Sequence, residues 1–156
     1  MFRIGKLTDY ALIIMSQMAT RPALQWRMES LADTTQLPLP TVRKLMRSLV
    51  SSSLVRSERG VHGGYQLTRL PELISVAEII TAIEGPISIT ECSEGESDCD
   101  RVGACDMESS WPAINGLIYQ LLRTLRLSDI EYTRGGHFDL SVLLHRLQQS
   151  PCPYPA

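Results

Sequence analysis

Three cysteines fall within one short polar stretch of this 156-residue chain, and their spacing limits the chemistry they can perform. Six residues separate Cys92 from Cys99, and five separate Cys99 from Cys105. Structural zinc sites usually contain cysteine pairs separated by about two to four residues, and this stretch has no such pair. Three thiolates in a polar loop suit an iron–sulfur cluster, because this soft group prefers sulfur ligands and can organise a loop around itself. The spacing therefore favours a cluster, with zinc or metal-free redox thiols as alternatives.

The three cysteines do not make a complete ligand set. Residues 85–110 contain seven Asp and Glu against a single Arg, and negative charge near a thiol opposes the thiolate form that binds metal. Two carboxylates are candidates for the missing ligand: Glu108, just beyond the third cysteine, and Asp9. An acid at the start of a helix is also explained by the helix dipole alone, so Asp9 has a structural interpretation too. The fourth cysteine, Cys152, has no Cys or His near it in the sequence and is the poorest ligand candidate.

The segment before the cysteines has the pattern of a helix–turn–helix. Apolar residues at helical spacing from Leu7 to Met18 predict a first helix. A short helix is expected over 28–33, and Pro38 with Pro40 predicts a turn, after which Pro40 suits the first position of another helix. The apolar face of this later helix consists of Val42, Leu45, Met46, Leu49 and Val50.

The opposite face of the same helix is basic, with Arg43, Lys44 and Arg47. Like charges four residues apart weaken an isolated helix, so their functional interpretation is contact with phosphates or base edges. The alternative is an ordinary solvated face. Thr41, near the start of this helix, completes the set of candidate DNA-binding residues on it.

The net charge of −2 hides a separation of charges along the chain. Residues 1–84 contain ten Lys and Arg against seven Asp and Glu, and residues 40–69 contain six basic side chains against Glu58 alone. A local basic patch is what contact with phosphates requires, whatever the global average. The charge pattern therefore predicts double-stranded DNA as a partner.

Two short strands, 54–57 and 65–68, are joined by a glycine-rich connection and predict a β-hairpin. A hairpin that directly follows a helix–turn–helix is a wing. Arg59 is expected at the wing tip, where it could enter the minor groove of DNA. His62 shares the tip and is a further candidate.

The remainder of the chain predicts more helices. Ser75 and Glu78 form a capping box at the start of one helix, and Gly85-Pro86 ends it. A long helix is expected from Ser110 to about residue 127. Its apolar side chains step by three and four residues over two heptads, at Trp111, Ile114, Ile118, Leu121 and Leu125. This seam favours a helix pair between two subunits over packing on its own domain, and a homodimer suits a palindromic operator.

These patterns predict a mainly α fold with a small β-hairpin wing, that is, a winged helix–turn–helix plus a long C-terminal dimerisation helix. We divide the chain into a DNA-binding domain (1–85), a cysteine loop (86–109), a dimerisation helix (110–131) and a tail (132–156). The tail is expected to contain a short helix near 140–147. No catalytic constellation or phosphate-binding loop is recognisable, so neither an enzyme nor a small-molecule substrate is expected. No apolar run reaches the roughly 20 residues of a membrane helix, and the beginning is unlike a signal peptide, which predicts a cytoplasmic protein without a membrane partner.

The chain resembles the Rrf-two family of bacterial regulators, in particular its IscR-like and NsrR-like members. The resemblance covers roughly residues 2–131 and rests on the three cysteines and on segments 7–11 (LTDYA), 59–65 (RGVHGGY) and 75–80 (SVAEII). Segments 85–93 (GPISITECS) and 111–115 (WPAIN) are most similar to regulators of the SUF iron–sulfur assembly operon. The resemblance implies an autoregulatory, redox-sensing repressor that carries a 2Fe–2S or 4Fe–4S cluster. A nitric-oxide or thiol-redox sensing repressor of the same fold is the alternative.

The resemblance also bears on the fourth ligand, because the chain departs from the IscR-like pattern. There a histidine stands three residues after the third cysteine, where this chain has Glu108, and the gap between the first two cysteines is one residue shorter. In the nitric-oxide-sensing branch, an aspartate of a Thr-Asp-Tyr motif reaches the cluster from the other subunit, and Asp9 matches it. The resemblance therefore favours Asp9, which would make the cluster bridge the two subunits.

Overall fold

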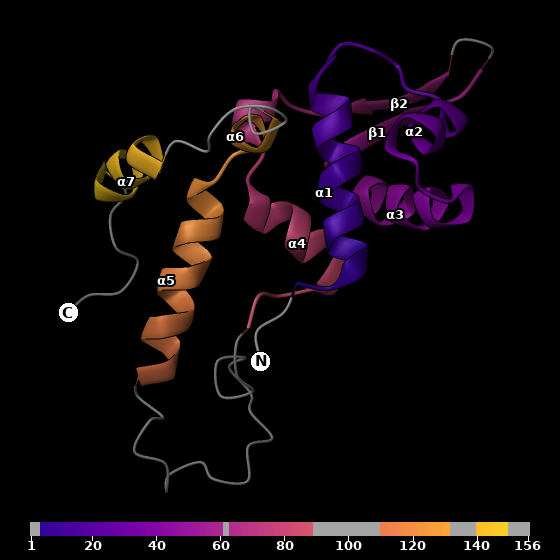
Figure 1. Ribbon diagram of the computed structural model, residues 1–156. Helices are drawn as coiled ribbons and strands as arrows, with labels where there is room; N and C mark the ends of the chain where they lie inside the picture. Colours follow the sequence, from indigo (N-terminus) through magenta and orange to yellow (C-terminus); the bar gives the residue numbers. More distant parts are fainter. Residues whose placement is uncertain (1–3, 61–62, 89–109, 132–139, 150–156) are drawn as a thin grey trace, which may run out of the picture.

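The computed structural model describes residues 4–60, 63–88, 110–131 and 140–149 (Figure 1). The first part of the chain forms α1 (Lys6–Ala19), α2 (Met28–Thr35), α3 (Leu39–Ser51) and the hairpin β1 (Val55–Glu58) and β2 (Gly64–Leu67). It continues with the 3-10 helix η1 (Pro71–Leu73), α4 (Val76–Glu84), α5 (Ser110–Thr124), α6 (Leu127–Glu131) and α7 (Leu140–Gln149). The predicted fold class, mainly helical with a small antiparallel hairpin, is confirmed.

The core forms around α1, which packs against α2, α3, α4 and α6 (Figure 1). Most of its predicted apolar face is buried, and Ile14 and Met15 have no exposed surface. Leu45 and Leu49 from α3 and Ile79 from α4 close the core from the other elements. Each such side chain contributes about 1.5–3 kcal/mol by leaving water. The core therefore fixes the orientation of α3, the basic helix, relative to α1.

The helix–turn–helix has the predicted order, with small shifts at its turn. α2 continues to Thr35, and the chain reverses at Gln36, which adopts left-handed backbone angles of φ 57 and ψ 31. α3 begins at Leu39, so Pro40 occupies its second position instead of the predicted first. This shift costs nothing, because none of the first four N–H groups of a helix has a partner within the helix.

The wing is a two-stranded antiparallel sheet whose strands are each shifted by one residue from the prediction. Its register pairs Val55 with Leu67 at the base and Glu58 with Gly64 at the open end. The chain before α2 adds an isolated bridge to β2, because the N–H and C=O groups of Trp26 and Tyr65 bond to each other at 2.8 Å in both directions. Gly64 permits this approach, since a Cβ there would lie 2.8 Å from the carbonyl oxygen of Trp26.

The predicted capping box at the start of α4 is confirmed. The Ser75 hydroxyl accepts a hydrogen bond from the Glu78 N–H at 3.3 Å, and the Glu78 carboxylate accepts one from the Ser75 N–H at 2.8 Å. Partial burial raises the pKa of Glu78, but the bonds from Ser75 and the ion pair with Arg69 at 2.6 Å outweigh burial and lower the pKa below 4.5. As predicted, α4 ends at Gly85, which has a φ of +90.

The helix expected from Ser110 to about residue 127 is present as α5, and the end of the segment 110–131 forms a separate helix, α6. α5 ends at Thr124, and Leu125 to Leu127 run alongside the start of α4. The Val76 N–H donates to the Leu125 carbonyl at 2.9 Å, and the Leu127 N–H donates to the Ile74 carbonyl at the same distance. Leu127 is fully buried in the core around α1. The end of the segment assigned to the dimerisation helix therefore packs into the N-terminal domain through Leu127.

α7 lies beside the upper part of α5 in Figure 1. Its Leu143 is buried, and its Arg146 pairs with Asp129 of α6 at 2.7 Å. The same Asp129 oxygen accepts a hydrogen bond from the Arg126 N–H at 2.8 Å, which caps α6. Within the described residues, no helix is both long and apolar enough to cross a membrane.

Candidate nucleic-acid interface and metal ligands

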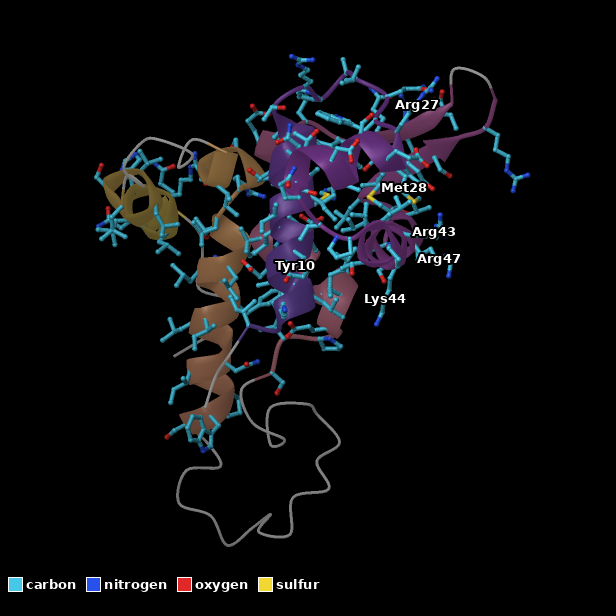
Figure 2. All side chains as sticks on the ribbon, turned by 45° about the vertical axis from the view of Figure 1, so that its right-hand side comes forward. Tyr10, Arg27, Met28, Arg43, Lys44 and Arg47 are labelled. Atoms are coloured by element: carbon cyan, nitrogen blue, oxygen red, sulfur yellow. The ribbon has the colours of Figure 1, made fainter. Side chains whose placement is uncertain are left out.

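The exposed side of α3 is the main basic surface of the helix–turn–helix. Arg43, Lys44 and Arg47 are exposed, while the opposite face of α3 is buried in the core. Figure 2 shows these three side chains pointing away from α1. Arg43 and Arg47 lie one helical turn apart, about 6 Å along the axis. This spacing allows both side chains to enter a major groove, which is about 12 Å wide.

Thr41 lies in the first turn of α3 and is half-buried. Its N–H donates to the Pro38 carbonyl at 2.9 Å, which ties the start of α3 to the turn. The N-terminal residues of a recognition helix are those that approach base edges. The structure therefore brings four of the six predicted DNA-binding residues together on one helix.

The wing lies on the same side of α1 as α3 (Figure 1) and carries a further basic residue. Arg59 directly follows β1, is exposed, and precedes Gly60, whose φ of +122 suits glycine. The prediction for His62 lies outside the described residues.

A polar network holds the wing to the segment before α2. Arg56 donates to the Gln66 side chain at 2.6 Å and lies 3.8 Å from the Glu58 carboxylate. Gln25 donates to the same carboxylate from the other side. Glu58, the acid among these basic residues, therefore joins the hairpin to the chain that leads into α2.

One basic residue near the wing, Arg27, was not predicted from the sequence. It is exposed and occupies the N-cap position of α2. Figure 2 shows it between α2 and the wing. The first N–H groups of a helix and a nearby Arg are groups that proteins use to contact DNA phosphates. No local pattern marked Arg27, because its place beside the wing depends on an isolated bridge between Trp26 and Tyr65, which leaves no periodic signal.

The structure describes one of the predicted metal ligands, Asp9. It lies in the first turn of α1, is exposed, and its side chain makes no hydrogen bond or ion pair within the described part of the chain. Its neighbours differ: Thr8 is buried, and Tyr10 is half-buried beneath the ammonium group of Lys6, 5.5 Å from the ring centre. A carboxylate left free in this way is available as a ligand.

The other predicted ligands lie outside the described residues: Cys92, Cys99, Cys105 and the alternative Glu108. Among the described residues, no group of three or more His, Cys, Asp or Glu could hold a metal ion. The donor set still fits the predicted cofactor chemically, because thiolates are the usual ligands of iron–sulfur clusters.

Residues 4–132 match the model of a protein family described as Rrf2, iron-dependent transcriptional regulator. The chain belongs to the Rrf2 family. It is 32% identical to the transcriptional regulator CymR of Bacillus subtilis over 135 residues, which cover 85% of this chain and 93% of CymR. It is 28% identical to the transcriptional regulator NsrR of Bacillus licheniformis over 97 residues, 62% of this chain and 68% of that one.

Solved structures of the Rrf2 family have the same fold. The structure of CymR, described as the global cysteine regulator of B. subtilis, matches with a TM-score of 0.66 and 29% identity over 84% of this chain and 97% of CymR. The structure of T. potens IscR matches with a TM-score of 0.65 and 23% identity over 90% and 96%. The predicted family is thus confirmed, and this chain is an Rrf2-family DNA-binding transcription regulator.

Proposed function

We propose that this Rrf2 regulator is a homodimeric repressor that senses an iron–sulfur cluster held by Cys92, Cys99 and Cys105. The observation that carries the proposal is the presence of three cysteines within one short segment of a chain whose family is described as iron-dependent. When bound, a 2Fe–2S or 4Fe–4S cluster supplies a group whose presence depends on iron and on redox conditions. The genes it controls would be those of iron–sulfur cluster assembly, including its own operon.

The fourth ligand in this proposal is Asp9. Its carboxylate is exposed and makes no bond with the described residues, so binding would break no interaction within this part of the chain. It stands on α1, the helix that shares a core with α3. A ligand at this position would therefore attach the cysteine segment of one subunit to the element that supports the basic helix of the other.

The homodimer is supported by the surface of α5. Leu117 is 65% exposed, and Ile114 and Leu121, one turn before it and one turn after it, are more than a third exposed. An apolar face of this kind is unfavourable in water and is typical of a helix that packs against a second copy. Two-fold symmetry would present two copies of α3 to successive major grooves of a palindromic operator.

In the DNA-bound dimer, Thr41, Arg43, Lys44 and Arg47 would contact the major groove. Arg59 and His62 at the wing tip would contact the minor groove. Basic side chains that reach phosphates make binding strongly dependent on salt, while those that reach base edges give sequence preference. Footprinting on a duplex selected by the protein from a random library would separate these two roles.

The test of the cluster uses protein purified without oxygen. We expect a brown protein that contains iron and acid-labile sulfide, and loss of both when Cys92, Cys99 or Cys105 is replaced by Ala. Cys152→Ala is the matched control, because the same chemical change at the fourth cysteine should leave the cluster in place. Protein that stays colourless after anaerobic reconstitution would refute the proposal.

The alternative function is a repressor of the same fold that responds to oxidation of its thiols or to nitric oxide. CymR, one of the similar proteins, is described as a global cysteine regulator, and the four cysteines of this chain would supply the thiols for such a response. In that case iron-free protein should lose or gain DNA affinity on treatment with diamide. Equal affinity in the reduced and oxidised iron-free forms would exclude it.

A further inference from the structure

One carboxylate joins the end of α4 to the beginning of α1. Glu84, the last residue of α4, accepts a hydrogen bond from the Gly5 N–H at 2.8 Å and another from the Thr8 hydroxyl. These partners lie 79 and 76 residues away in the sequence. We name Gly5, Thr8 and Glu84 the α1–α4 clamp.

The three residues of the clamp are in close contact. Thr8 has no exposed surface, and its hydroxyl donates to the carboxylate of Glu84, which lies at the surface. A Cβ at Gly5 would lie 2.5 Å from the Glu84 carboxylate oxygen, so a larger residue there would displace the carboxylate. α1 has no side-chain cap from its own N-cap residue, and Glu84 supplies the missing acceptor and a favourable negative charge.

The position of the clamp relates two parts of the proposed sensor. On one side, Asp9 directly follows Thr8, and Cys92 lies only eight residues beyond Glu84 in the sequence. On the other side, α1 packs against α3 through the shared core. Through the clamp, a movement of the end of α4 would therefore also move the first turn of α1, and a movement of that turn would also move the end of α4.

We propose that the α1–α4 clamp couples the state of the cluster to the DNA-binding helix α3, with Glu84 as the positioning residue. This inference rests on the proposed function. The clamp makes the end of α4 and the first turn of α1 a single unit, so that binding or release of the ligands moves α1 as a whole. Without the carboxylate, the two ends can separate, and movement of one is no longer passed to the core beneath α3.

The experiment compares DNA affinity with and without the cluster in the full-length protein. The probe is a duplex that the cluster-loaded wild-type protein selects from a randomised library, and affinity is measured without oxygen at fixed salt. The ratio of the iron-free to the loaded dissociation constant reports coupling, which is typically about 5- to 150-fold in regulated proteins. We expect Glu84→Ala and Thr8→Val to bring this ratio to within about threefold of one, while Thr8→Ser retains most of the wild-type value.

Three further measurements separate coupling from general damage. Glu72→Ala removes an exposed carboxylate of η1 and should retain the wild-type ratio. Iron and sulfide analysis checks that each loaded variant contains the cluster. Hydrogen exchange of iron-free Glu84→Ala should be faster at the first-turn amides of α1 and unchanged in α3, whereas general unfolding would speed both.

The outcomes distinguish the two proposals. A wild-type ratio of one would refute cluster sensing itself, and the clamp inference with it. A wild-type ratio well above one that is retained in Glu84→Ala would refute the clamp alone. A ratio abolished as completely by Glu72→Ala as by Glu84→Ala would also refute the clamp alone.

Discussion

Leu127 and Leu117 are leucines in the segment predicted to be one dimerisation helix, and the structure gives them opposite environments. Leu127 is fully buried beneath α1, while Leu117 is 65% exposed on α5. Leu127→Ala removes core side-chain volume and leaves a cavity, which costs about 2–5 kcal/mol. Against a typical stability of about 5–15 kcal/mol, that loss is a large fraction of the total.

Leu117→Ala should affect association instead of the fold of each subunit. About two-thirds of the side chain is still open to water in one subunit, so its burial between subunits would contribute about 1–2 kcal/mol per copy. Two copies per dimer give about 2–4 kcal/mol, which weakens dimerisation by roughly 30- to 1,000-fold.

The assay is urea denaturation at several protein concentrations, with sedimentation velocity to follow the dimer. Leu127→Ala should lower the transition midpoint at every concentration, whereas Leu117→Ala should shift the dimer dissociation constant and lower the midpoint most in dilute samples. Equal losses for the two variants, or a loss below about 1 kcal/mol for Leu127→Ala, would show that the division into α5 and α6 is wrong.

Three other variants test separate parts of the structure. Glu78→Ala removes half of the capping box with Ser75 and should lower the free energy of unfolding by about 1 kcal/mol at neutral pH. Because the folded state lowers the pKa of Glu78, the difference in stability from wild type, measured in urea, should shrink as the pH falls through and below 4.5. A difference that grew in that range would contradict the capping role of Glu78. Gly64→Ala places a Cβ against the Trp26 carbonyl and should cost about 1–3 kcal/mol in urea, and an unchanged midpoint would contradict the close approach. Arg47→Gln should weaken DNA binding and reduce the slope of log affinity against log salt by about 0.9 if the residue contacts a phosphate, so an unchanged affinity and slope would remove Arg47 from the interface.

The elements predicted most accurately from the sequence are those whose buried and exposed faces depend on the spacing of nearby residues. The apolar face of α1, the basic and buried faces of α3, and the capping box of α4 all follow from residues within a few positions of each other. Gly85 marked the end of α4 for the same reason, since a positive φ favours glycine.

The break between α5 and α6 could not be predicted in this way. Leu125 and Leu127 continue the apolar pattern of the preceding helix, so local spacing favours one long helix. The chain extends there because it pairs with Ile74 and Val76, about fifty residues earlier in the sequence. Glu84 was missed for the same reason, because its partners at the start of α1 are distant in the sequence.

Only some residues of the candidate site could be predicted from the sequence. The basic residues of α3 and Arg59 lie on exposed surface, as their positions in the pattern indicated. Arg27 was missed, because its place beside the wing depends on a pairing of two residues. The cysteine ligands remain a prediction from residue type and spacing. Asp9 is the one proposed ligand that lies among the described residues.

The attachment of α7 depends on a carboxylate that has a second role. Asp129 caps α6 through the Arg126 N–H and pairs with Arg146 of α7 through the same oxygen. One side chain therefore holds the first turn of α6 and the position of α7 together, so a change of this residue would disturb two helices at once.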